Sequence, residues 1–157
     1  MPVQHAPIDF IAYDADGAVV LLLEAKSRHG ISDSWAAKLR RNILAHGGLP
    51  NAMYFLIATP ERMYGWKLEA AELSPHEVPP DFTVDAQKVL APYFAKFNQD
   101  PANIGPRAFE LLVLTWLTDM AKSPENRLEL DPSLSYLSES GLLSSLRHAE
   151  IEMNPAR

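Results

Sequence analysis

Two long apolar runs constrain the fold more than any other feature of the chain. Residues 18–26 (AVVLLLEAK) and 52–59 (AMYFLIAT) are apolar on both faces of an extended chain over most of their length. Strands of this kind lie in the interior of a sheet that is covered on both sides. Residues 8–13 (IDFIAY) predict another strand. The DADG of residues 14–17 between them predicts a hairpin turn, because Asp and Gly tolerate the required backbone angles.

A helix is expected between the two apolar runs. It begins near Ser32, an N-capping residue, and ends before the glycines at 47 and 48. Trp35, Leu39 and Ile43 recur every four residues and predict its buried face. Residues 63–67 (MYGWK) predict a further strand. The order strand, turn, strand, helix, strand, strand predicts an α/β fold with a mixed central sheet and a helical crossover.

The second half of the chain is expected to be mostly helical. Residues 68–84 are rich in proline and acidic residues, which predicts a loop around the edge of the domain. Helical patterns and a last edge strand follow; the helices span about 84–97, 106–122 and 138–147, and the strand 150–153. A length of 157 residues suits one domain. We therefore expect a core at 1–67 and a C-terminal helical extension at 68–157 that packs on it.

Composition excludes several classes of protein. There is no cysteine, so disulfides and thiolate metal sites are excluded, and a cytoplasmic location is expected. The N-terminus has no signal-peptide pattern, and no apolar run approaches the ~20 residues of a membrane span, so no membrane partner is expected. The net charge of −6 argues against a general nucleic-acid coat protein. It divides unevenly, with +1 in residues 1–68 and −7 in residues 69–157.

Polar side chains at the end of the first apolar run form the candidate site. Glu24 and Lys26 lie two residues apart and therefore share a face of the strand. If Tyr13 opposes Ala18 across the turn, Asp9 opposes Leu22 and becomes the diagonal neighbour of Glu24, within about 7–8 Å at the backbone. Carboxylates at that spacing can converge on one cation. An acid at the hairpin tip would be several strand residues away from Glu24, too far to share a ligand.

These residues carry a resemblance to a known family. Asp9, then Glu24-Ala25-Lys26 on an apolar strand, then a basic-sided helix and another apolar strand resemble the PD-(D/E)xK nuclease superfamily. The stretch from residue 7 to 67 is similar to its uncharacterised bacterial, restriction-endonuclease-like members, in the helix WAAKLRRNILAHG and the strand pair MYFLIATPERMYGWK. There are two departures: the family's Pro-Asp pair is here Pro7-Ile8-Asp9, and the helix that precedes the first strand in many members has no counterpart in the seven residues before it.

The resemblance implies a restriction-endonuclease-like sheet and a Mg²⁺-dependent endonuclease that hydrolyses DNA phosphodiester bonds. Asp9 and Glu24 would hold Mg²⁺ or Mn²⁺, and the carbonyl of Ala25 would add a ligand. Lys26 would orient or help deprotonate the attacking water and stabilise charge in the transition state.

A basic cluster follows the motif. Arg28, Lys38, Arg40 and Arg41 fall within 14 residues of one another and predict contacts to DNA phosphates beside the site. The alternative for each residue is an ordinary solvated helix surface.

Two other interpretations stay open. Glu24 and Lys26 also fit a same-face ion pair at a partly exposed strand end. The chain also fits a catalytically inactive nuclease-fold module whose acidic C-terminal half binds a protein partner or self-associates as a homodimer. The five histidines show no metal-ligand spacing, and the sequence has no glycine-rich phosphate loop.

Overall fold

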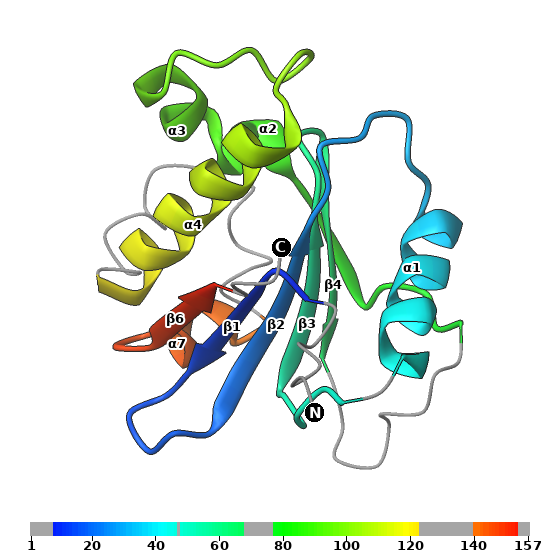
Figure 1. The fold of residues 1–157 in the computed structure, drawn as a ribbon, viewed down its shortest axis with the longest axis vertical. Coiled ribbons are helices and arrows are strands. Elements are labelled where there is room, and N and C mark those ends of the chain that lie inside the picture. The colour runs from blue at the N-terminus through cyan, green and yellow to red at the C-terminus, as the bar shows by residue number, and fades with distance from the viewer. Residues whose placement is uncertain (1–7, 47, 68–76, 123–139, 154–157) are drawn as a thin grey trace, which may run out of the picture.

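The computed structural model describes residues 8–46, 48–67, 77–122 and 140–153. Six strands form one mixed sheet in the order β5-β4-β3-β2-β1-β6 (Figure 1). Their bounds are β1 Phe10–Tyr13, β2 Val19–Ala25, β3 Tyr54–Ala58, β4 Arg62–Lys67, β5 Phe82–Asp85 and β6 Glu150–Met153. Only β2 and β3 are parallel, and every other neighbouring pair is antiparallel. The apolar runs were predicted to be interior strands, and the positions of β2 and β3 confirm this.

The β1–β2 hairpin has a different register from the one predicted. Tyr13 pairs with Val19 instead of Ala18, and an irregularity between Ala12 and Tyr13 shifts the rest of the ladder, so that Phe10 pairs with Leu23. Continuing this register by one residue places Asp9 directly opposite Glu24. The predicted pairing of Asp9 with Leu22 is therefore wrong by two residues, because the turn is one residue longer than expected and a bulge adds a second residue that displaces every later pair.

Helices cover both faces of the sheet. On one face lies α1 (Asp33–Ala45), which connects the parallel strands β2 and β3. On the opposite face Figure 1 shows α3 (Ala91–Lys96) and α4 (Pro106–Lys122). The helix α4 has the predicted bounds and buries Phe109, Leu112, Val113, Trp116 and Leu117 against the sheet. Among the described residues, no helix is long and apolar enough to cross a bilayer.

The C-terminal half supplies both outer strands of the sheet. The strand β6 was predicted, whereas β5 lies where a loop and the start of a helix were expected. The helix expected over 84–97 is divided into α2 (Ala86–Val89) and α3 at Leu90. Pro92 at the start of α3 has no N–H to continue the helical ladder, which accounts for the break. Near the predicted third helix, α7 spans Leu142–Ser145. Residues 68–76 of the expected loop, and the expected helix start at 138–139, lie outside the described residues.

Gly65 on β4 allows β5 to pack closely. It pairs with Phe82, and the Phe82 ring occupies the space where a side chain at position 65 would lie. We expect Gly65→Ala to lower the free energy of unfolding by about 1–3 kcal/mol, because the ring must move out of this space. Urea denaturation of Gly65→Ala, Phe82→Ala and the double variant measures the coupling. The double variant should lose less stability than the sum of the single losses, and strict additivity would contradict the contact.

Candidate active site

Asp9 and Glu24 are buried side by side on the face of the sheet that α1 covers. Each residue is only 2% exposed. Leu22 packs in the cluster on the α1 side, and Glu24, two residues further along β2, shares that face. The new register brings the two acids closer than the predicted diagonal would. Ionised carboxylates are costly to bury, so this pair requires compensating partners.

Each acid is held by the backbone of the opposite strand. The Asp9 N–H donates a hydrogen bond of 3.0 Å to Glu24 Oε1, and the Ala25 N–H donates one of 2.8 Å to Asp9 Oδ2. We call this reciprocal arrangement the acid clasp. Because the donors belong to the strand backbone, both carboxylates are fixed relative to each other and to the sheet.

Lys26 lies between the acid clasp and solvent. Its Nζ is 3.3 Å from Glu24 Oε2, and its side chain is about one-third exposed. Its backbone N–H donates to the Ala58 carbonyl at 2.9 Å, which anchors the residue just beyond the end of β2. The structure thus brings Asp9, Glu24 and Lys26 together on one face, with an ammonium at the open side of two buried carboxylates.

The protein ligands that this site offers a cation are few. Among the described residues, no group of three or more Asp, Glu, His or Cys side chains could hold a metal ion. Two carboxylates fit Mg²⁺, which is commonly bound through one or two carboxylates and keeps several waters. The role of the Ala25 carbonyl stays a prediction; the structure gives Ala25 a bond through its N–H to Asp9.

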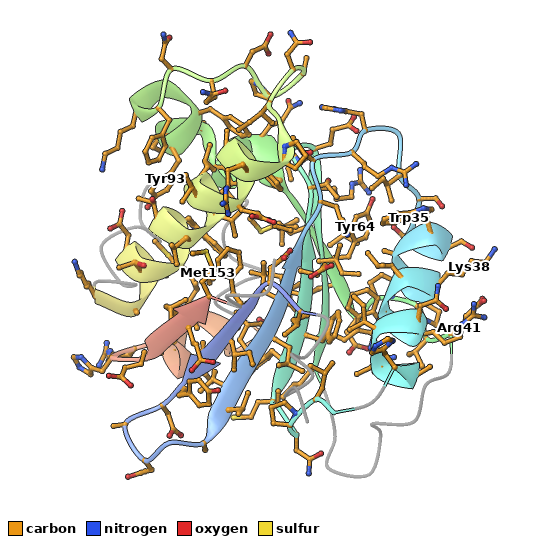
Figure 2. The ribbon with its side chains drawn as sticks, in the orientation of Figure 1. Trp35, Lys38, Arg41, Tyr64, Tyr93 and Met153 are labelled. Carbon is orange, nitrogen blue, oxygen red and sulfur yellow. The ribbon has the colours of Figure 1, made fainter. Side chains whose placement is uncertain are left out.

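The basic cluster does not gather around the acid clasp. Lys38 and Arg41 point away from the sheet on the outer side of α1 (Figure 2). Arg41 forms an ion pair of 2.7 Å with Glu77. The Arg28 guanidinium lies 5.3 Å from the centre of the Trp35 ring. A phosphate-binding role for these three residues stays a prediction, now on a surface beside α1.

The prediction that Arg40 contacts phosphate is wrong. Arg40 is 2% exposed, and its guanidinium lies 5.5 Å from the centre of the Trp66 ring in the core. The buried face of α1 consists of Ala36, Ala37, Arg40, Ile43 and Leu44. The predicted face was Trp35, Leu39 and Ile43; burial of Ile43 is confirmed, whereas Trp35 and Leu39 are partly exposed. The buried face is displaced by about one residue from the predicted face, and it includes the charged side chain of Arg40.

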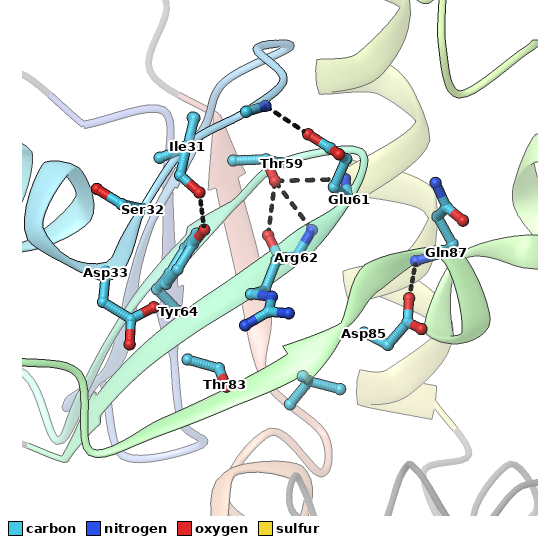
Figure 3. Close-up of a pocket in the computed structure, with 12 residues that line it drawn as sticks. Ile31, Ser32, Asp33, Thr59, Glu61, Arg62, Tyr64, Thr83, Asp85 and Gln87 are labelled. Atoms are coloured by element: carbon cyan, nitrogen blue, oxygen red, sulfur yellow. Dashed lines mark hydrogen bonds between the residues drawn. The ribbon is translucent and has the colours of Figure 1, made fainter.

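Sequence reasoning missed a cleft of about 560 Å³ on the same face of the sheet (Figure 3). Its walls are the start of α1 with the residues before it, the β3–β4 turn, and the β4–β5 edge. The lining includes Asp33, Glu61, Arg62, Tyr64, Thr83 and Asp85. Because β5 was not predicted, neither was the wall that it forms.

Tyr64 fixes the wall of this cleft that faces α1. Its hydroxyl donates a hydrogen bond of 3.0 Å to the Ile31 carbonyl, and the Gly30 N–H donates one of 2.7 Å to Glu61 Oε1. Burial of the ring raises the pKa of the Tyr64 hydroxyl, and nearby Asp33 and Glu61 add to this against the opposing effect of Arg62. The hydroxyl therefore stays protonated and keeps donating.

Comparisons of the chain with protein-family models, with curated proteins and with solved structures give no match.

Proposed function

We propose that the protein is a Mg²⁺-dependent endonuclease of the PD-(D/E)xK type that hydrolyses DNA phosphodiester bonds. One observation carries the proposal, namely that Asp9, Glu24 and Lys26 meet on one face of the sheet at the end of β2. The hairpin, the helical crossover and the parallel strand β3 also follow the order of elements on which the resemblance rests.

In this proposal the acid clasp holds the cation. Asp9 and Glu24 provide the carboxylate ligands, and bound Mg²⁺ or Mn²⁺ would neutralise charge on the phosphoryl oxygens and make a water more acidic. The backbone hydrogen bonds keep the carboxylates oriented without the cation, which lowers the reorganisation needed when it binds.

Lys26 acts on the reacting groups. Its ion pair with Glu24 places a positive charge next to the cation ligands and within reach of solvent. From there it donates hydrogen bonds to the attacking water and to the phosphoryl oxygens, where negative charge grows in the transition state. The water oxygen bonds to phosphorus and releases a proton to solvent, one P–O ester bond breaks, and the leaving oxygen takes up a proton from solvent water.

A second candidate is the inactive interaction module. The acid clasp favours it in one respect, because its hydrogen bonds also pin β1 to β2 without any metal. Leu111 on α4 and Met153 on β6 are exposed apolar side chains that a partner could cover. This candidate requires neither metal binding nor a function for Lys26.

Lys26→Ala separates the two candidates. We expect wild type to nick plasmid DNA with Mg²⁺ or Mn²⁺ and not with EDTA. The Lys26→Ala rate should fall by about a hundredfold or more, because a positioned charge or proton-transfer group is removed. Lys96→Ala, a change at an exposed position on α3, is the matched control and should cut like wild type. Cutting that survives Lys26→Ala, or an inactive wild type, would contradict the proposal.

A further inference from the structure

We propose that the cleft between α1 and the β4–β5 edge binds an unpaired nucleobase of the substrate, with guanine as the best match. This inference rests on the proposed function and extends it to the class of substrate, namely single-stranded or base-extruded nucleic acid.

Arg62 is the principal donor in the cleft. It is exposed on β4, and Figure 3 shows its guanidinium between Asp33 and Asp85 in that view. Within the described residues, no carboxylate oxygen lies within 4.0 Å of the guanidinium. Its donors are therefore available to a ligand.

Asp85 supplies the complementary acceptor. It is paired directly with Arg62 across β4 and β5, and its Oδ1 accepts the Gln87 N–H at 3.0 Å. That hydrogen bond orients the carboxylate at the cleft wall. Thr83, the strand partner of Tyr64, adds a hydroxyl beside it.

This combination matches the hydrogen-bonding groups of guanine. Arginine donates in bidentate fashion to guanine O6 and N7, the commonest specific contact to a base. The N1–H and N2–H₂ of an unpaired guanine are donors that suit a carboxylate acceptor. The N1–H and N2–H₂ groups lie on the Watson–Crick edge of guanine, which is paired with the opposite base in a duplex. The cleft therefore suits an unpaired base.

Charge argues against a phosphate as the occupant. Asp33, Glu61 and Asp85 face the cleft with Arg62 as the opposing charge, which gives a formal net charge of −2 on these four side chains. Such a lining repels a phosphate dianion and accepts the amino and imino groups of a neutral base.

The cleft lies near the acid clasp, on the same sheet. Glu24 pairs with Ile57, and Ile57 pairs with Tyr64, so two strand spacings separate Glu24 from the cleft wall. This corresponds to about 10 Å at the backbone. A nucleotide that is close to the scissile phosphate in the same nucleic-acid strand spans such a distance.

Nucleosides without phosphate test the inference separately from catalysis. The full-length ¹⁵N-labelled protein would be titrated, without metal, with guanosine, adenosine, cytidine and thymidine and followed by amide chemical shifts. Guanosine should bind most tightly and shift the amides around Arg62, Thr83 and Asp85. Arg62→Ala should weaken guanosine binding at least about fivefold, the lower end for one bidentate base contact.

Matched variants control for folding. Asp85→Asn keeps an acceptor for the cap of α2 and should reduce the preference for guanosine over adenosine. Arg107→Ala, at an exposed position on α4, should bind like wild type. Equal binding of all four nucleosides, no shifts in the cleft, or displacement of guanosine from these amides by spermidine or inorganic phosphate would overturn the inference.

The two proposals fail in different ways. Guanosine binding by a protein that never cuts DNA would overturn the proposed function and leave the base-binding cleft standing. Metal-dependent cutting with no guanosine binding would overturn the cleft and leave the endonuclease standing.

Discussion

Glu24→Ala is expected to abolish metal-dependent DNA cleavage and to destabilise the β1–β2 hairpin at the same time. It removes a proposed cation ligand, so the cleavage rate should fall at least about a hundredfold, more than the change of an outer-shell partner usually costs. It also leaves the buried Asp9 N–H without the acceptor that it has in the wild type. A buried donor that loses its acceptor costs about 1–3 kcal/mol, which urea denaturation would detect.

Glu24→Gln separates these two effects. The glutamine amide oxygen can still accept the Asp9 N–H, and only the ion pair with the partly exposed Lys26 is lost, so the free energy of unfolding should fall less than in Glu24→Ala. The side chain no longer carries the negative charge that a Mg²⁺ site requires, and cleavage should be lost as in Glu24→Ala. A Glu24→Gln protein that cuts DNA at the wild-type rate would show that the acid clasp is structural only.

Arg40→Ala is expected to lower the free energy of unfolding by about 3 kcal/mol. The change removes a buried side chain that packs over Trp66, and it leaves a cavity between α1 and the sheet. Lys38→Ala, at an exposed position on the same helix, should change stability by less than about 0.5 kcal/mol.

Arg40→Met tests whether packing or charge matters at this position. Methionine fills much of the same space without a buried charge, so stability should recover most of the loss seen with alanine. Chemical denaturation measures all three variants. An Arg40→Ala protein of wild-type stability but weaker DNA affinity would restore the phosphate-binding role that the buried position contradicts.

The interior of the sheet could be predicted from the sequence because its signals are local and strong. The apolar runs of β2 and β3 each reflect the burial of one continuous strand. The helical spacing of Phe109, Trp116 and Met120 likewise reflects the burial of one face of α4. The shared face of Asp9 and Glu24 in the hairpin could also be predicted, because side chains alternate between the two faces along a strand.

The errors arose where tertiary packing decides the outcome. A turn one residue longer than expected and a bulge next to Tyr13 changed the register, and a residue pattern cannot reveal such a bulge. The strand β5 is only four residues long and carries polar residues at Thr83 and Asp85, so it gives little strand signal. The charge of Arg40 suggested a surface position, whereas its spacing from Ala36 and Ile43 places it on the buried face.

The central claim is that Asp9 and Glu24 share one divalent cation. Isothermal titration calorimetry of the metal-free protein with Mg²⁺, and in parallel with Mn²⁺, tests it most directly. We predict saturable binding to wild type that is weakened at least about tenfold by Asp9→Asn, a change that keeps an oxygen acceptor for the Ala25 N–H. A folded wild-type protein that binds neither ion, or binds both as tightly after Asp9→Asn, would contradict the account.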